Sequence, residues 1–302
     1  MASLAITPMA YRHVVFPDAP EGNGYAVNFT PHPSELSRAV LVEQELTSDE
    51  HACIRWIFEQ AGLQLLDYRF ETLKRRIPSC LRALRVDSVA QVCKVIERQP
   101  DLLRIAISTL VIGVTSFFRD PQVFSTLEQF GLPEVLSRSC QPRIWSVGCS
   151  DGTELYSVAM LLAQRGAIQR CAMLGTDCRL DAIARARAGC YDAVALKAVP
   201  GEFLGRYFKA DNGLWQIHPF LRASVQWRYG DAIHTAEPGS WDLILCRNMA
   251  IYLQPAAAGR LWAKLGQSLR PGGILVTGKA ERPYGAVGLR PVAQCVYQRD
   301  RS

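Results

Sequence analysis

Long hydrophobic runs are absent from this sequence, and no apolar stretch reaches the ~18 residues that a membrane-spanning helix needs. The first residues lack the basic start and the apolar block of a secretory signal. Cys-x-x-Cys pairs are absent, and the ten cysteines are scattered singly among only five histidines. This pattern argues against a zinc site and against a disulfide framework. We therefore expect a cytoplasmic chain without membrane insertion or bound metal, whose cysteines are reduced thiols in the core.

Two nucleotide-binding signatures are also missing. The sequence contains no GxGxxG and no GxxxxGK[ST] pattern. Their absence argues against a dinucleotide pyrophosphate site and against a nucleoside-triphosphate P-loop. Internal repeats and low-complexity tracts are not found either.

What is present is a globular composition, with 49% hydrophobic and 21% charged residues over a length of 302. Residues 1–42 carry Pro, Gly and Asn without periodicity and are predicted to be an irregular N-terminal extension. Residues 43–112 show helical spacing after a Thr47 or Ser48 cap, which predicts an all-helical domain. Residues 113–302 alternate short apolar runs with helical stretches. This alternation predicts an α/β domain with a mostly parallel sheet.

The formal charge of +6 is concentrated in one helical region. Between Arg69 and Arg104 there are nine basic residues and four acidic ones. A basic patch is compatible with an acidic protein partner, an anionic membrane or nucleic acid, and also with a plain solvated helix face. Stacking aromatics are sparse here, which argues against nucleic acid.

Small and acidic side chains follow the apolar runs that we read as strands. The stretch IWSVGCSDGTELYS places Gly148 and then Glu154 after the first run, although an ordinary tight turn without a ligand would give the same glycines. Asp177 ends CAMLGTD, and Asp231 follows WRYG. At the carboxyl edge of a parallel sheet, Asp177 is placed to accept hydrogen bonds from ribose hydroxyls, and Asp231 from the exocyclic amine of adenine. A cofactor with adenosine and no phosphate fits best, which indicates S-adenosylmethionine.

The ordered motifs resemble the chemotaxis receptor methyltransferases of the CheR type, over roughly residues 45–298. The motifs that carry the resemblance are TSFFRD, SVGCSDGTELYS, LGTDC, WDLILCRNMAIYL and LRPGGILVTGKAE. The resemblance implies a class I S-adenosylmethionine-dependent methyltransferase (Rossmann-like) with an N-terminal all-helical receptor-docking domain. It also implies a small antiparallel β-subdomain at about residues 204–229.

The resemblance also implies residue roles. Arg119 and Tyr252 would be catalytic, facing each other across the active site. The implied cofactor-binding residues are Thr115, Arg119, Gly148, Glu154, Asp177, Asp231, Ala232, Arg247 and Asn248. The implied substrate-docking residues are Lys74, Arg75, Arg76, Arg82 and Arg85. Taken alone, Tyr252 would equally well be a helix-packing aromatic.

The reaction implied by the resemblance is methylation of glutamate side chains on the cytoplasmic helical domain of a chemoreceptor. It would give glutamate methyl esters and S-adenosylhomocysteine, and we expect a monomeric enzyme. Several positions depart from the family pattern, including Gly113 where Asn is common and Asp151, Thr153 and Leu155 in the loop. Pro78 interrupts the basic helix, so that helix is expected to kink or start again at Ile77 and Pro78. These departures leave two alternatives open: a binding module with little transfer, and a methyltransferase for small molecules or nucleic acid.

Overall fold

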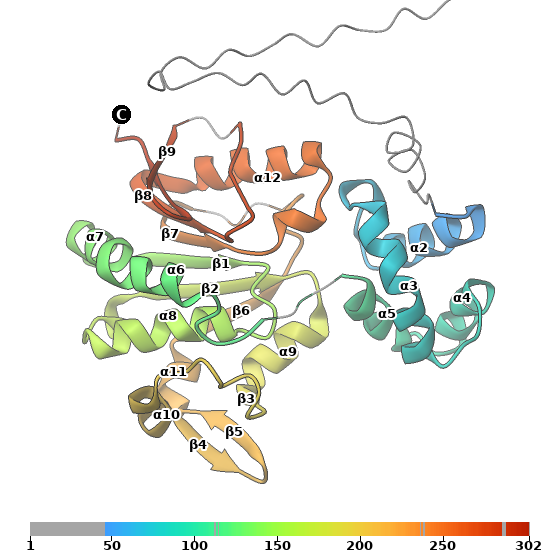
Figure 1. Ribbon diagram of the computed structural model, residues 1–302, viewed down its shortest axis with the longest axis horizontal. Helices are drawn as coiled ribbons and strands as arrows, with labels where there is room; N and C mark the ends of the chain where they lie inside the picture. Colours follow the sequence, from blue (N-terminus) through green and yellow to red (C-terminus); the bar gives the residue numbers. More distant parts are fainter. Residues whose placement is uncertain are drawn as a thin grey trace, which may run out of the picture. The chain divides into compact units, whose positions relative to one another are not determined.

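The computed structural model describes residues 46–111, 113, 115–235, 237, 239–285 and 288–301. The expected irregular extension, residues 1–42, lies outside the described residues. Seven strands form one sheet in the order β6-β2-β1-β7-β8-β10-β9 (Figure 1). They are β1 (Arg143–Val147), β2 (Ala172–Asp177), β6 (Val225–Tyr229), β7 (Trp241–Cys246), β8 (Leu269–Thr277), β9 (Leu289–Ala293) and β10 (Val296–Arg299). The pairs from β6 to β8 are parallel and the pairs of β10 antiparallel, which confirms the prediction of a mostly parallel sheet.

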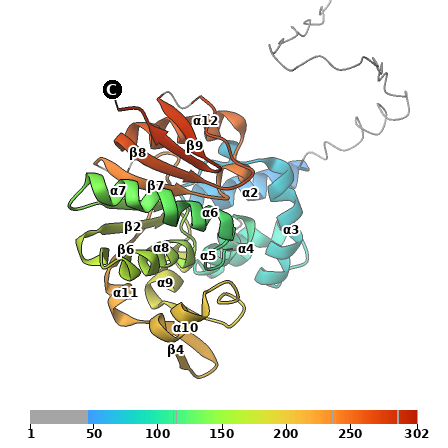
Figure 2. The same cartoon turned by 60° about the vertical axis from the view of Figure 1, so that its left-hand side comes forward.

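The central strand β1 is buried on both faces, as its apolar sequence requires. Ile144 packs into the core on the side of α8, whereas Trp145 and Val147 pack into the core that includes α12. The helices of this domain are α6 (Pro121–Thr126), α7 (Leu132–Arg138), α8 (Thr153–Gln164), α9 (Leu180–Ala188) and α12 (Pro255–Ser268). Figure 2 shows α6, α7 and α8 together on one side of the sheet.

The N-terminal described region is helical, as predicted. It comprises α2 (Ser48–Gln60), α3 (Phe70–Leu84), α4 (Val89–Arg98) and α5 (Leu102–Leu110). Thr47 caps α2 by accepting a hydrogen bond from Glu50 N, while the Glu50 side chain accepts one from Thr47 N, so the predicted cap is a capping box.

Of the two expectations for the basic helix at Ile77 and Pro78, a restart is wrong, and a kink stays a prediction. Helix α3 runs without a break from Phe70 to Leu84 through Pro78. Pro78 is on the exposed side of the helix, where water can solvate the carbonyl that loses its N–H partner. The opposite side buries Leu73, Ile77 and Leu84, and this apolar packing holds the helix together.

Backbone hydrogen bonds join the helical region to the segment after β7. Tyr68 and Leu253 form an isolated antiparallel bridge. Arg69 N donates to Tyr252 O at 2.9 Å, and Arg69 Nε donates to Leu253 O at 2.9 Å. The helical region is therefore attached beside the predicted catalytic tyrosine.

A second sheet has three antiparallel strands in the order β3-β5-β4: β3 (Cys190–Tyr191), β5 (Leu214–Ile217) and β4 (Phe208–Asp211). Asn212 and Gly213 both have positive φ in the two-residue turn between β4 and β5, as expected for the DNG sequence. Helices α10 (Gly201–Tyr207) and α11 (Pro219–Ala223) flank this sheet. Its limits differ from the expected 204–229, because the sheet begins at Cys190 and Val225–Tyr229 pairs with β2 in the large sheet.

All ten cysteines are free thiols, but not all lie in the core. Cys140 and Cys190 are exposed, which corrects the expectation of core thiols for these two. Within the described ranges, no helix is both long and apolar enough to cross a membrane. The same ranges contain no group of three or more His, Cys, Asp or Glu side chains able to hold a metal.

Candidate active site

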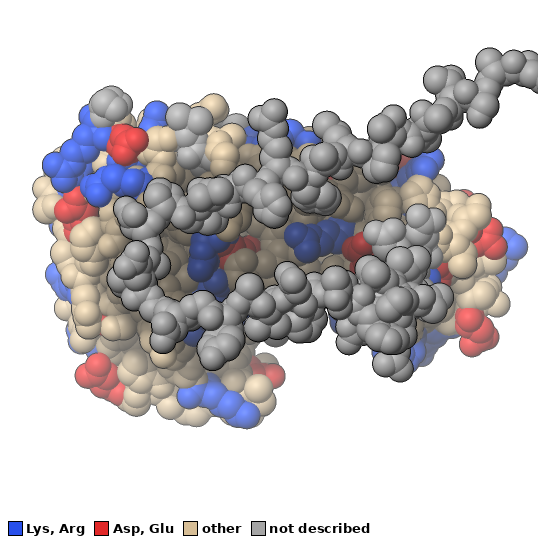
Figure 3. Space-filling view, turned by 45° about the horizontal axis from the view of Figure 1, so that its top comes forward, with Lys and Arg blue, Asp and Glu red and all other residues tan. Residues whose placement is uncertain are grey.

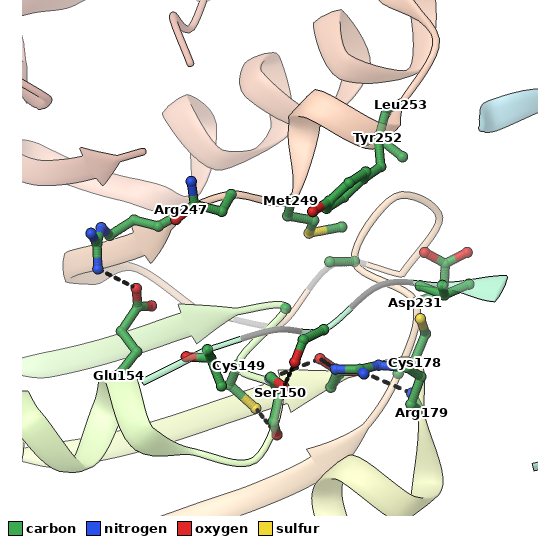
Figure 4. Close-up of a pocket in the computed structure, with 18 of the residues that line it drawn as sticks. Cys149, Ser150, Glu154, Cys178, Arg179, Asp231, Arg247, Met249, Tyr252 and Leu253 are labelled. Carbon is green, nitrogen blue, oxygen red and sulfur yellow. Dashed lines mark hydrogen bonds and ion pairs between the residues drawn. The ribbon is translucent and has the colours of Figure 1, made fainter. Parts of the chain in front are cut away.

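A pocket lies at the carboxyl ends of β1, β2, β6 and β7 (Figure 4). The chain passes from β1 to β2 and β6 on one side and to β7 and β8 on the other, so the strand order reverses beside β1. Such a switch point is where open parallel sheets bind ligands. The pocket holds about 860 Å³ of empty space, part of it open to solvent. The structure brings to its walls every catalytic and cofactor-binding residue named from the sequence: Thr115, Arg119, Gly148, Glu154, Asp177, Asp231, Ala232, Arg247, Asn248 and Tyr252.

The loop after β1 passes close to the neighbouring strand end. Gly148 has φ +65°, and a Cβ on it would lie 3.0 Å from the Met249 sulfur. Ser150 also has positive φ, and its hydroxyl donates to Gly113 O at 2.8 Å. Gly148 therefore allows both the positive φ that the turn requires and the close approach of two strand ends.

Glu154, in the first turn of α8, is held by Arg247 at the end of β7. Arg247 Nη1 donates to Glu154 Oε2 at 3.0 Å, and the Ser146 hydroxyl donates to Oε1 at 3.0 Å. Burial raises the pKa of Glu154, and the charge of Arg247 opposes that rise. Arg247 also binds Asp120 and donates to Arg119 O at 2.7 Å, so it positions the segment that carries Arg119.

Asp177, at the end of β2, has its carboxylate bound by nearby groups of the chain itself. It accepts hydrogen bonds from Ser150 N at 2.8 Å and from Arg179 N at 3.0 Å. The Arg179 side chain adds an ion pair with Nε at 3.0 Å from Oδ1. Arg179 was not identified from the sequence, because nothing in LGTDCRLD shows that the guanidinium turns back toward the strand end.

Asp231 and Ala232 follow β6 on the far side of the pocket. Asp231 Oδ1 accepts a hydrogen bond from Ile233 N at 2.9 Å, and the other oxygen accepts none from the described residues. Burial raises the pKa of Asp231. The Lys264 ammonium donates to Ala232 O at 3.2 Å and fixes this turn. An acceptor therefore remains at the position expected for an adenine amine.

Asn248 begins a tight turn after β7 with φ +56°. Its backbone is held by Glu281, a side chain that is only 2% exposed. Glu281 accepts hydrogen bonds from the N–H groups of Asn248, Met249, Ala250 and Gly278, at 2.7 to 2.9 Å. Glu281 was missed as a site residue, although its place in GKAE, after an apolar strand, was visible.

The two predicted catalytic residues come from different elements. Arg119 lies in the turn before α6, and Tyr252 ends the short helix η4 (Ala250–Tyr252). The Tyr252 ring lies at the pocket beside Met249 (Figure 4). Thr115 lies on the same segment as Arg119, and its hydroxyl is 2.7 Å from that of Thr153. Tyr68 of the helical region also lines the pocket, a contribution that sequence reasoning did not foresee.

Comparison with known proteins agrees with this geometry. The family description "CheR methyltransferase, SAM binding domain" matches residues 113–290, and "CheR methyltransferase, all-alpha domain" matches residues 50–111. The chain belongs to the CheR methyltransferase family. As a member it binds S-adenosylmethionine and is an S-adenosylmethionine-dependent methyltransferase of the type associated with chemotaxis. The resemblance seen in the sequence is thereby confirmed.

Individual relatives cover most of this CheR-family chain. The chemotaxis protein methyltransferase of Listeria monocytogenes is 30% identical over 239 residues, 79% of this chain and 91% of its own. Chemotaxis protein methyltransferase 1 of Pseudomonas aeruginosa is 28% identical over 235 residues, 73% of this chain and 85% of its own. Likeness to solved structures is weaker. The glycopeptide N-methyltransferase MtfA complexed with S-adenosylmethionine covers 54% of each chain at 13% identity and a TM-score of 0.33, too low to carry an argument.

The residues present fit the cofactor. The pocket combines apolar walls from Val111, Met249 and Leu253 with two carboxylates at strand ends and one in the first turn of α8. Arg247 Nε is buried and has no hydrogen-bond partner among the described residues. Arg247 also lines the pocket, and its positive charge is suited to the carboxylate end of the cofactor.

The predicted docking residues do not all lie on one open surface. Arg75, Arg82 and Arg85 are exposed, while Lys74 and Arg76 are partly buried. Arg76 Nε donates to Thr109 O at 2.9 Å and thus joins α3 to α5. On the face seen in Figure 3, basic and acidic side chains are mixed over both the helical region and the sheet domain.

Proposed function

We propose that this chain methylates glutamate side chains on the cytoplasmic helices of a chemoreceptor, giving glutamate methyl esters. The observation that carries the proposal is the gathering of Arg119, Tyr252 and the cofactor residues around one pocket, in a chain of the CheR family. The relatives named above are called chemotaxis protein methyltransferases, which supports the same acceptor class.

The chemistry asks little of the protein as an acid or base. A glutamate with an ordinary pKa of ~4.3 is already ionised at neutral pH, so its oxygen can attack without a general base. S-adenosylmethionine supplies the electrophilic methyl group on its sulfonium. The protein must hold the acceptor oxygen in line with that carbon and exclude water.

We assign the orienting role to Arg119 and Tyr252. A tight two-pronged pair between Arg119 and the acceptor carboxylate would lower its nucleophilicity, so we expect one contact to a single oxygen or to the cofactor carboxylate. Glu154, Asp177, Asp231 and Arg247 would hold the cofactor.

Methyl labelling tests this assignment. Incubation with labelled cofactor and membranes from the native cell is expected to give base-labile methyl groups on receptor bands. Arg119→Ala should abolish labelling while leaving the thermal unfolding midpoint near that of wild type. Labelling by this variant at the wild-type rate would contradict the assigned role.

Receptor docking on α3 is the second part of the proposal. Arg75 and Arg82 are one heptad apart on the exposed side of the helix and would attract an acidic receptor helix. Reversing both charges to Glu should raise KM for the receptor at low salt, with little change in cofactor affinity. Arg301→Glu is the control, because Arg301 is exposed, pairs with the partly buried Glu134 and lies outside α3. A wild-type enzyme whose KM is insensitive to ionic strength would count against docking by charge.

One observation leaves a second candidate function open, namely a binding module with little methyl transfer. Asp177 and Glu154, both assigned to the cofactor, are each paired with an arginine of the chain itself. Calorimetry with the cofactor and methyl labelling together separate the two functions, because a binding module would bind without labelling.

A further inference from the structure

The carboxylate of Asp177 has no hydrogen-bonding capacity left. An ionised carboxylate offers about four lone-pair positions, and here each oxygen accepts two hydrogen bonds. Oδ1 accepts from Arg179 N and Nε, both at 3.0 Å. Oδ2 accepts from Ser150 N at 2.8 Å and from Arg179 Nη2 at 3.3 Å. Two of the four donors belong to the backbone, and the other two belong to the guanidinium of Arg179.

That guanidinium lies inside the site. Arg179 is only 5% exposed, and it lines the pocket together with Asp177 and Gly113. A Cβ on Gly113 would overlap with the guanidinium, so the missing side chain at Gly113 leaves the space that Arg179 fills. Figure 4 shows Arg179 reaching along the floor of the pocket toward Ser150.

We propose that Arg179 competes with the ribose of the cofactor for Asp177 and must leave this carboxylate before the ribose hydroxyls can donate to it. The two backbone donors are fixed by the loops, so only the guanidinium bonds can be exchanged for O–H donors. A neighbouring hollow with about 450 Å³ of empty space, part of it open to solvent, is also lined by Arg179, together with Cys178, Leu180 and Tyr229. Space for the displaced side chain therefore lies next to the site.

The proposal rests on the cofactor assignment and is independent of the methyl acceptor. It makes Arg179 a residue that sets cofactor affinity, and it couples that residue to Gly113. A side chain with a purely structural role would lower stability and affinity together when removed. A competitor lowers stability but raises affinity.

Calorimetric titration with S-adenosylhomocysteine tests the proposal in the full chain. Arg179→Ala is expected to lower the Kd by about tenfold, since at least that factor is associated with a hydrogen bond to a charged group. The same variant should unfold at a lower temperature without ligand, because Asp177 loses its buried partner. Gly113→Ala keeps the charge but displaces the guanidinium, so it should also lower the Kd and should add nothing in the Arg179→Ala background.

Arg165→Ala is the matched control, because Arg165 forms an ion pair with Glu128 outside the pocket. Its Kd should equal that of wild type. An unchanged or higher Kd in Arg179→Ala would overturn the proposal, and a higher one would show that Arg179 holds the ribose. If Arg179→Ala does not fold, Gly113→Ala decides by the same criterion. Failure to label a receptor, with binding of S-adenosylhomocysteine intact, would bear only on the proposed acceptor.

Discussion

Replacing Glu281 by Gln should destabilise the fold and loosen the turn that carries Asn248. The Glu281 carboxylate accepts four backbone N–H groups, two at each oxygen, and its side chain is 2% exposed. Glutamine keeps one oxygen, which can serve two of these donors, but its NH₂ group would face the other two. Each buried donor left unsatisfied costs ~1–3 kcal/mol, so we expect a loss of about 2–6 kcal/mol in the free energy of unfolding.

Urea unfolding followed by tryptophan fluorescence and by circular dichroism measures this loss, provided that the two transitions coincide. The Kd for S-adenosylhomocysteine should rise in the same variant, because two of the N–H groups that Glu281 holds, those of Asn248 and Met249, belong to pocket-lining residues. Glu128→Gln is the control, since Glu128 is in a surface pair with Arg165, and such pairs contribute ~0–1 kcal/mol.

Two results would refute this reasoning. A loss below ~1 kcal/mol would mean that the four hydrogen bonds are replaced at little cost, for example by water. A large loss with an unchanged Kd would mean that Glu281 supports the fold without shaping the pocket.

Three further predictions concern other parts of the molecule. Gly175→Ala should destabilise the protein by ~1–3 kcal/mol in urea unfolding, because its Cβ would overlap with the ring of Trp227. Asp67→Asn should lose ~1–3 kcal/mol, because the buried Asp67 carboxylate binds Arg260 across the junction with the helical region. Burial raises the pKa of Glu154, so this group favours folding at low pH and the favourable contribution is lost as pH rises through its raised pKa. In its proposed role Glu154 holds the cofactor in the charged form, so cofactor affinity should fall on acidification from a pH above the ordinary glutamate range, and Glu154→Gln should remove that part of the dependence.

The sequence was sufficient to predict residues that the structure gathers around one pocket, because the walls of this pocket are strand ends. An apolar run followed by small or acidic residues marks where a parallel strand stops, and neighbouring strands stop at the same edge. Asp177 and Asp231 were found in this way. The catalytic roles of Arg119 and Tyr252 were predicted only through the resemblance, because neither residue follows directly on a predicted strand.

The contacts that the sequence did not reveal are pairings between distant side chains, or pairings that depend on a single rotamer. Glu281 reaches the turn at Asn248 across 33 positions, and Arg179 turns back on Asp177 two residues away. Strands β9 and β10 were also not predicted, because Pro291 and the buried Gln298 weaken the apolar pattern of these segments. The predicted restart of α3 at Pro78 was wrong because it rested on the low helix propensity of proline and left out the tertiary packing that overrides it.

The basic helix α3 and Tyr252, the proposed catalytic tyrosine, share one backbone junction, and this geometry would relate the proposed docking to the proposed catalysis. Arg69 directly precedes α3 and donates to the carbonyls of Tyr252 and Leu253. At ~1.5 Å per residue, Arg75 and Arg82 lie ~9 and ~20 Å along the helix from that junction. A helix docked beside α3 would meet the two arginines one heptad apart, a spacing that acidic residues repeated on one side of a partner helix can match.

The arginines can then fix the register of the acceptor helix, while its end nearest Arg69 lies beside the segment that carries Tyr252. On this view, charge reversal on α3 changes which glutamate reaches the pocket as well as how tightly the receptor is held.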